Sequence, residues 1–192
     1  MVAHPCGMLG KSTGVCGKAA PKTGRQRGNR HQEVHIVIEA GKPFPPFELP
    51  ADNGKTIGSK DLVGKPYVIY FYPKDGTSGC TLEGQAFSAL LPKFTALGVR
   101  VIGVSPDSVK SHCKFRDKHD LKVALAADED RALIESLGIW VDKQMYGKVY
   151  KGVERTTYLV DGKGKVEQIW GKVKVPEHAA EVLAAAKMLA AK

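Results

Sequence analysis

One segment of the chain sets the expectations for the rest: Tyr70-Phe71-Tyr72-Pro73-Lys74-Asp75-Gly76-Thr77-Ser78-Gly79-Cys80-Thr81-Leu82-Glu83. It predicts the end of a buried strand, a turn, and a helix that begins close to the cysteine. The six apolar and aromatic residues 67–72 indicate the strand, and Pro73 ends it because proline has no N–H to donate to a sheet. Four apolar residues at three- and four-residue spacing indicate the inner face of the helix: Leu82, Ala86, Phe87 and Leu90.

Cys80 is expected in the first turn of that helix. Unpaired backbone N–H groups and the positive end of the helix dipole favour an anion there, and the anion available is the thiolate of Cys80. A thiolate is the nucleophilic form of cysteine, but a catalytic cysteine also needs neighbours that stabilise the transition state. Thr77 lies one turn earlier, and its hydroxyl can both donate and accept hydrogen bonds with a two-oxygen substrate.

Pro73, Thr77 and Cys80 form the pattern P-x-x-x-T-x-x-C. This pattern is the signature of the peroxiredoxins, and the chain from about Phe44 to Leu189 resembles their bacterioferritin comigratory protein (peroxiredoxin Q) branch. Further segments at the spacing of that branch are Val104-Ser105-Pro106-Asp107-Ser108, Ser111-His112, Tyr146-Gly147-Lys148 and the stretch 152–161. A lone T-x-x-C would be a weak signal, whereas several such segments in order are specific.

The resemblance implies an α/β, thioredoxin-like fold, with a central mixed sheet flanked by helices. It implies a thiol-dependent peroxidase that reduces hydrogen peroxide and alkyl hydroperoxides through a sulfenic acid on Cys80. Thioredoxin or a glutaredoxin-like thiol would recycle the enzyme, and neither a cofactor nor a metal is expected. Cys80, Thr77 and Arg155 would be the catalytic residues, with Pro73 and Glu83 in support.

Arg155 and Glu83 are assigned through the resemblance. Arg155 is far from Cys80 in sequence, but Gly-Val-Glu-Arg-Thr-Thr matches the family segment whose arginine faces the reactive sulfur. Its guanidinium would stabilise the thiolate and donate to the peroxide oxygens; the alternative is a surface arginine on a strand. Glu83 would disfavour the thiolate unless the helix amides or an arginine neutralise it. The alternative for Glu83 is a favourable acid in the first helical turn.

Two departures from the family bear on recycling and on the helix start. Ser78 stands where proline is usual, and we expect it to be tolerated because serine caps helices well. Gln85 stands where many members carry their resolving cysteine. Cys113 is the candidate resolving cysteine, on the helix after Ser108, although the position used by some members aligns with Arg116. Otherwise Cys113 is a small buried residue, and an external thiol reduces the sulfenic acid directly.

The composition of 192 residues, 43% of them hydrophobic, suits a globular domain, and the net charge of +9 comes mainly from one end. Residues 1–32 hold six basic residues and no acid, which leaves 23 bases against 20 acids elsewhere. We therefore expect a flexible basic tail over 1–33 and the peroxiredoxin domain over 34–192. Cys6 and Cys16 lack the spacing of a zinc site. Nucleic-acid binding, organellar targeting and membrane spans are disfavoured, so we expect a cytoplasmic protein. We also expect a monomer or a weak dimer.

Two other functions remain to be distinguished. A thioredoxin-type disulfide oxidoreductase is disfavoured because Glu83 fills the place of the second cysteine in C-x-x-C. The other is a non-catalytic redox or nucleic-acid-binding protein that uses the basic tail. We also expect His112 and His119 to be solvent-facing or lightly packed. Three residues could wall the substrate entrance or simply pack a loop: Trp140, Met145 and Tyr146.

The remaining pattern predicts alternating strands and helices. A short strand is expected at 34–38, a hairpin turn at 52–55 and a helix bend or break at Pro92. Strands are expected at 99–104 and 122–126, with helices at 108–119 and 130–137. A hairpin follows over 156–160 and 165–170, and Pro176 opens the last helix.

Overall fold

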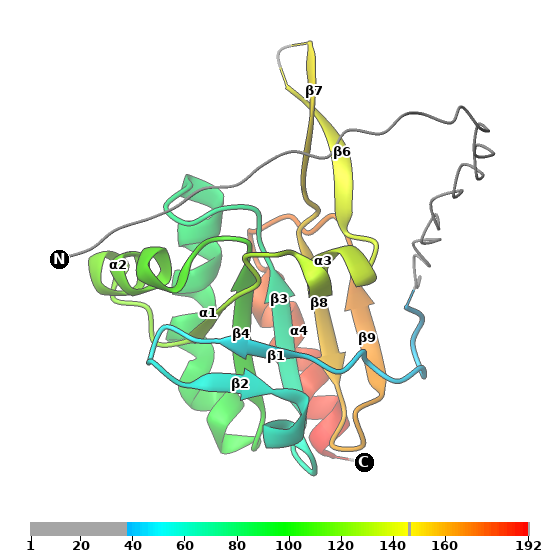
Figure 1. The fold of residues 1–192 in the computed structure, drawn as a ribbon. Coiled ribbons are helices and arrows are strands. Elements are labelled where there is room, and N and C mark those ends of the chain that lie inside the picture. Colours follow the sequence, from blue (N-terminus) through cyan, green and yellow to red (C-terminus); the bar gives the residue numbers. More distant parts are fainter. Residues whose placement is uncertain (1–37, 146, 192) are drawn as a thin grey trace, which may run out of the picture. The chain divides into compact units, whose positions relative to one another are not determined.

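The computed structural model describes residues 38–145 and 147–191. Its centre is a five-stranded sheet in the order β5-β4-β3-β8-β9 (Figure 1). The strands are β3 (Tyr67–Phe71), β4 (Arg100–Ser105), β5 (Ala124–Ala127), β8 (Thr156–Val160) and β9 (Val166–Trp170). β3 and β4 are parallel, as are β4 and β5, whereas β8 runs antiparallel to both β3 and β9. The predicted α/β fold with a central mixed sheet is therefore confirmed.

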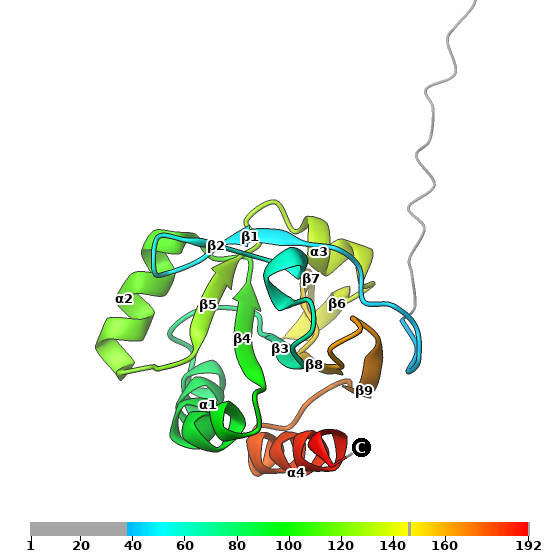
Figure 2. The ribbon, with the colours of Figure 1, turned by 90° about the horizontal axis from the view of Figure 1, so that it is seen from below.

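Both faces of the sheet are covered, which explains why all five residues of β3 are buried. On one face, α1 (Ser78–Ala96) and α4 (His178–Ala190) pack against the sheet, and Figure 2 shows them side by side. α2 (Val109–His119) lies beside β5 and adds Phe115 to the same apolar cluster. The helices thus bury Tyr70, Tyr72 and the sulfur of Cys80 in one core.

The opposite face carries the first elements of the domain and one later short helix, as Figure 2 also shows. These are the hairpin of β1 (Glu48–Pro50) and β2 (Thr56–Gly58), the short 3-10 helix η1 (Ser59–Leu62) and α3 (Ala132–Ser136). Their apolar side chains form a second cluster around Phe44, Phe47 and Ile134. The predicted turn at 52–55 connects β1 to β2, as expected.

A further hairpin, β6 (Trp140–Met145) with β7 (Lys148–Val153), projects from the body of the domain (Figure 1). The sequence did not predict it. Trp140, expected as a possible wall of the substrate entrance, packs against the second cluster and lies under the guanidinium of Arg131. Met145 is the last residue of β6, and Tyr146 lies outside the described residues.

The expectation for the inner face of α1 is wrong at Leu82, and of the bend or break expected at Pro92 the break is excluded. Leu82 is 59% exposed, because the side of α1 that faces the sheet carries Cys80, Glu83 and Phe87 at three- and four-residue spacing. Pro92 does not break the helix, which continues to Ala96. Pro92 is exposed, so the carbonyl that loses its helical partner there can be hydrated instead.

Most other boundaries agree with the sequence to within about two residues. Ser108 caps α2, since its Oγ accepts a hydrogen bond from the N–H of Ser111. The hairpin of β8 and β9 and the last helix α4 are present as predicted. The predicted tail over 1–33 and nearly all of the predicted strand at 34–38 lie outside the described residues. Within the described ranges, no helix is long and apolar enough to cross a membrane.

Candidate active site

Cys80 is the third residue of α1 and lies just beyond the carboxyl end of β3. Its side chain is only 2% exposed and packs in the core cluster under α1 and α4. The residues between the strand and the helix form a tight turn, in which Gly76 has φ +72°. Cys80 therefore sits where the first-turn amides of α1 point, as the sequence predicted.

Arg155 reaches the sulfur from the next strand of the sheet. Thr156, the first residue of β8, pairs with Phe71, the last residue of β3. Arg155 precedes Thr156, so it lies at the same edge of the sheet as the turn that leads to Cys80. Its Nη2 donates to Cys80 Sγ at 3.2 Å. A Cβ at Gly79 would lie 3.4 Å from that nitrogen, an ordinary van der Waals contact.

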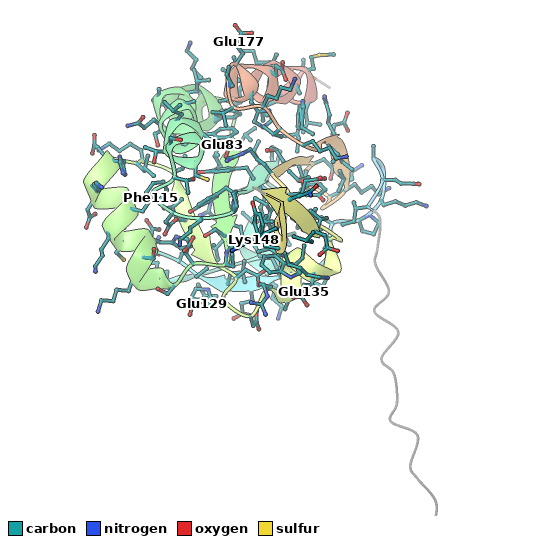
Figure 3. All side chains as sticks on the ribbon, turned by 90° about the horizontal axis from the view of Figure 1, so that it is seen from above. Glu83, Phe115, Glu129, Glu135, Lys148 and Glu177 are labelled. Atoms are coloured by element: carbon teal, nitrogen blue, oxygen red, sulfur yellow. The ribbon has the colours of Figure 1, made fainter. Side chains whose placement is uncertain are left out.

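Glu83 is held by the same guanidinium, because Arg155 Nη1 donates to its Oε2. The carboxylate is 1% exposed and lies on the side of α1 that faces the sheet (Figure 3). Burial raises the pKa of Glu83 to about 7, against the charge and hydrogen bond of Arg155. Burial works to lower the pKa of Arg155, but the charges of Glu83 and Cys80 outweigh it and raise that pKa. Of the two neutralising groups expected for Glu83, the helix amides or an arginine, an arginine is thus in contact with it.

Thr77 and Pro73 shape the turn before Cys80. Thr77 is the N-cap residue of α1, and its Oγ1 donates to the carbonyl oxygen of Lys74 at 3.2 Å. It is exposed, one helical turn from the sulfur. Pro73 is half-buried directly after β3. The expectation that Ser78 acts as the cap is wrong: Ser78 is the first helical residue, the position that proline also favours.

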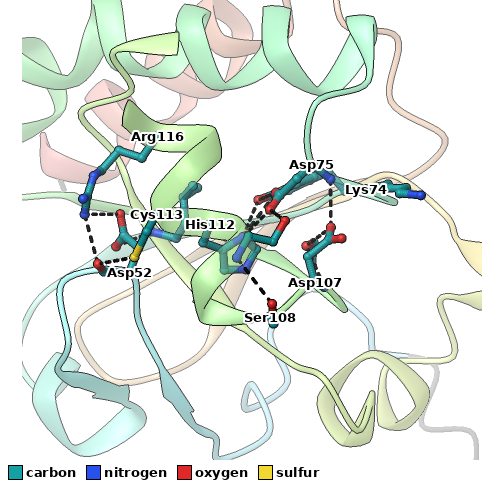
Figure 4. A network of polar contacts seen from close by, with 12 residues as sticks. Asp52, Lys74, Asp75, Asp107, Ser108, His112, Cys113 and Arg116 are labelled. Atoms are coloured by element: carbon teal, nitrogen blue, oxygen red, sulfur yellow. Dashed lines mark hydrogen bonds and ion pairs between the residues drawn. The ribbon is translucent and has the colours of Figure 1, made fainter. Parts of the chain in front are cut away.

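Cys113 is half-buried on α2 and is turned toward the hairpin of β1 and β2 (Figure 4). Its thiol donates to the carbonyl oxygen of Asp52 at 3.2 Å. Arg116 Nη1 donates to the same oxygen and to Asp52 Oδ2, each at 3.0 Å. Cys80 and Cys113 are both free thiols in this structure, and their sulfurs bind different partners.

His112 was expected to be solvent-facing or lightly packed. This expectation is wrong, because its side chain on α2 is fully buried. Its Nδ1 lies 2.9 Å from Asp75 Oδ2 in the turn before Cys80 (Figure 4). The sequence did carry a signal, since His112 and the buried Phe115 are three residues apart on one helix. His119, in contrast, is partly exposed with its ring against Phe115, which fits the lightly packed position expected for it.

No group of three or more His, Cys, Asp or Glu side chains within the described ranges is arranged to hold a metal ion. The site is instead a buried thiol, a guanidinium and a carboxylate at the start of a helix. A guanidinium beside sulfur stabilises the thiolate and can donate to an oxygen on which negative charge develops. Such a site is suited to nucleophilic attack by sulfur on a substrate that carries oxygen.

Comparison with known proteins agrees with this chemistry. Residues 40–169 match the model of the AhpC/TSA family, and the chain belongs to that family. It is 46% identical over 148 residues to the putative peroxiredoxin Bcp of Coxiella burnetii, with 77% of this chain and 98% of that protein covered. It is 43% identical to peroxiredoxin Bcp of Bacillus subtilis over 157 residues, 82% of this chain and all of that protein.

The fold is also similar to that of a solved Xanthomonas campestris bacterioferritin comigratory protein. The TM-score is 0.73 at 44% identity, with 80% of this chain and 98% of the other covered. That structure is described in terms of alkyl peroxide reduction activity. The thiol-dependent peroxidase predicted from the sequence is therefore confirmed, and a disulfide oxidoreductase or a non-catalytic binding protein is not favoured.

Proposed function

We propose that Cys80 is the thiol that reacts with the peroxide and that Arg155 is the group that activates it. The observation that carries this proposal is the 3.2 Å contact from Arg155 Nη2 to Cys80 Sγ at the start of α1. One guanidinium binds both the sulfur and Glu83, so its position relative to the sulfur is fixed by two contacts.

In the reaction, the thiolate of Cys80 attacks one oxygen of the hydroperoxide. A sulfur–oxygen bond forms as the oxygen–oxygen bond breaks, and the other oxygen leaves with the electron pair of that bond. The thiol proton ends on the leaving oxygen, so a thiol and a hydroperoxide give a sulfenic acid and an alcohol, or water from hydrogen peroxide. The Arg155 guanidinium donates toward the oxygen on which charge builds.

Thr77 is proposed to bind the peroxide. Its hydroxyl can leave the Lys74 carbonyl, accept a hydrogen bond from the peroxide proton and remain one turn from the sulfur. Pro73 and Glu83 support the turn and the guanidinium. Hydrogen peroxide and alkyl hydroperoxides are the proposed substrates, the latter because the Xanthomonas relative is described as reducing alkyl peroxides.

The sulfenic acid must then be reduced by a thiol, which is either a second cysteine of the chain or an external thiol. Cys113 could form a disulfide with Cys80, which requires the two Cα atoms to come within about 7 Å. The Cys113 thiol would first leave Asp52, and the first turn of α1 would unwind. Otherwise an external thiol attacks the sulfenic acid directly. In either case thioredoxin or a glutaredoxin-like protein is the proposed reductant, acting in the cytoplasm on a monomer or weak dimer.

The test is consumption of hydrogen peroxide coupled to thioredoxin, thioredoxin reductase and NADPH. The parent is compared with Cys80→Ser and Cys113→Ser. We expect Cys80→Ser to be inactive, and a parental rate in this variant would refute the proposal. Loss of thioredoxin-supported turnover in Cys113→Ser would make Cys113 the resolving thiol. Retained turnover would point to direct reduction or to a cysteine of the tail, Cys6 or Cys16.

A further inference from the structure

His112 and Asp75 form a buried pair that the reaction as described does not use. His112 Nδ1 lies 2.9 Å from Asp75 Oδ2 and 3.2 Å from Oδ1. The His112 side chain is fully buried and that of Asp75 is 7% exposed. Because a carboxylate accepts, Nδ1 must carry the proton in this arrangement. The pair joins α2 to the turn that precedes Cys80.

The Asp75 carboxylate accepts two further hydrogen bonds, one from α2 and one from the residue that follows β3. The hydroxyl of Ser111, on α2, donates to its Oδ2 at 2.7 Å, and that of Tyr72 donates to its Oδ1 at 2.8 Å. Burial works to raise the pKa of Asp75, but the hydrogen bonds from His112 and Ser111 outweigh it and hold the pKa below its ordinary value. A carboxylate bound in this way stays ionised and fixes the groups around it.

A second carboxylate holds the backbone of the same turn. The N–H of Asp75 donates to Asp107 Oδ2 at 2.8 Å, and the hydroxyl of Ser105 donates to the same oxygen at 2.8 Å. Asp107 lies between β4 and α2, so the turn is connected by main chain and side chain to one neighbouring segment (Figure 4). Rotation of the turn relative to α2 would break both sets of bonds.

The position of Asp75 in the chain makes these bonds relevant to catalysis. It stands two residues before Thr77 and five before Cys80, in the turn between β3 and α1. Arg155 approaches from β8, on the opposite side of β3 from β4 and its α2 connection. The sulfur and the guanidinium thus come from separate parts of the fold, and a displacement of the turn changes their alignment.

We propose that His112 and Asp75 are positioning residues of the peroxidase site: their buried pair fixes the Thr77–Cys80 turn relative to Arg155. This inference rests on the proposed role of Cys80 and goes beyond it. Because Cys113 follows His112 on α2, the same pair also ties the segment of one domain cysteine to the segment of the other.

The test compares His112→Leu, which removes the donor, with His112→Asn, whose amide can donate from close to the place of Nδ1. The rate constant for oxidation of Cys80 by hydrogen peroxide is measured in a single turnover of reduced protein. We expect His112→Leu to lower it by about tenfold or more, the value of one buried charge-assisted hydrogen bond. His112→Asn should recover a substantial part of that loss. His119→Asn, on the same helix but against Phe115, is the matched control and should retain the parental rate.

Alkylation of Cys80 by iodoacetamide separates positioning from a general effect on the fold. Alkylation depends on Arg155 only through the amount of thiolate, whereas the peroxide reaction also needs the guanidinium aligned with the peroxide oxygens. The peroxide rate should therefore fall more than the alkylation rate. In Asp75→Asn combined with His112→Leu, the loss should be smaller than the two single losses multiplied, because both act through one contact. Equal falls in the two rates, or independent effects of the two substitutions, would overturn the proposal.

If His112→Leu does not fold, Ser111→Ala takes its place, since it removes one of the hydrogen bonds that the Asp75 carboxylate accepts. We expect about a fivefold loss in the peroxide rate for this variant, again with less effect on alkylation. Folded variants with the parental peroxide rate would refute the role of the pair. A Cys80→Ser variant that still consumes peroxide would instead refute the proposed function itself, so the two failures are distinguishable.

Discussion

The guanidinium of Arg155 touches both the sulfur of Cys80 and the carboxylate of Glu83, which no single-point cation can reproduce. We therefore expect Arg155→Lys to lower the rate constant for oxidation of Cys80 by about ten- to a hundredfold. A lysine keeps the charge but loses one of two charge-assisted hydrogen bonds, each worth about 1.5–3 kcal/mol. The loss should be measured in a single turnover with hydrogen peroxide.

Arg100→Lys provides the control for that substitution. Arg100 is exposed at the first residue of β4 and pairs with Tyr67, at the end of β3 away from Cys80. The Arg100→Lys variant should react with peroxide at the parental rate. Equal rates for Arg155→Lys and the parent would contradict the role given to the guanidinium.

Glu83 predicts a pH dependence of stability. Its pKa in the folded state is about 7, above its ordinary 4.5, so the folded state binds the proton more tightly than the unfolded chain. Its contribution to stability is therefore greatest below pH 4.5 and declines as the pH rises toward 7. The free energy of unfolding of the parent, measured in urea relative to Glu83→Gln, should decrease between pH 5 and pH 8. An increase over that range would show that the charge of Arg155, and not burial, determines the direction in which the pKa of Glu83 is shifted.

Single residues also show what a sequence can and cannot reveal. Cys80, Thr77 and Pro73 follow from one local pattern, because the turn and the helix start are encoded by neighbouring residues. The contact of Arg155 with Cys80 depends on the pairing of β3 with β8, which local pattern does not determine, so only the family resemblance suggested it. The pair of His112 and Asp75 was missed for the same reason, since its residues lie on different elements.

Among the elements, α1 gives a testable case because Pro92 lies inside it. Proline lacks the N–H that would donate one turn back, and its ring crowds the preceding carbonyl. Pro92 is exposed, so no packing compensates for this cost. We expect Pro92→Ala to stabilise the folded protein by roughly 1–3 kcal/mol in urea unfolding.

Peroxide reactivity should not change in Pro92→Ala, since Pro92 lies more than three helical turns from Cys80. The exposed neighbour Lys93 offers a control, and Lys93→Ala should leave stability within about 0.5 kcal/mol of the parent. A lower free energy of unfolding in Pro92→Ala would mean that the proline shapes the packing of α1 against α4.

The elements also differ in how well the sequence predicted them. The inner strands β3 and β4 lie in mostly apolar runs of sequence and were found, because both of their faces are buried. The hairpin of β6 and β7 was missed because the first four residues of β7 are all exposed and so show no alternation. Leu82 was wrongly assigned to the buried face of α1. The prediction counted only apolar residues with helical spacing and so did not include Cys80 and Glu83, which are buried there.

For the whole molecule, His178 predicts acid sensitivity. It is buried on α4 with its ring between Phe87 and Trp170, and its Nε2 lies 2.8 Å from the hydroxyl of Thr157. Burial, with a smaller effect of the Arg155 charge, lowers the pKa of His178 to about 4. The unfolded chain binds the proton near pH 6.5, so folding stability is lost as the pH falls from 6.5 toward 4.

Between pH 7.5 and pH 4.5, this group should cost the parent about 2–3 kcal/mol of its free energy of unfolding. His178→Gln keeps an amide near Thr157 but does not titrate. Its free energy of unfolding should therefore fall by about 2–3 kcal/mol less than that of the parent over the same pH range. Urea unfolding of both proteins at the two pH values checks the difference. Equal losses would mean that His178 takes up its proton without unfolding.

The most direct test identifies the cysteine that hydrogen peroxide oxidises. Reduced protein is mixed with a stoichiometric amount of hydrogen peroxide, the sulfenic acid is trapped with dimedone, and the labelled cysteine is identified by peptide mass spectrometry. The same experiment in urea gives the reactivity of the unfolded thiols. We predict labelling on Cys80, at a rate far above that of the unfolded chain. Label on another cysteine, or a folded rate no higher than the unfolded one, would contradict the assignment of Cys80 and Arg155.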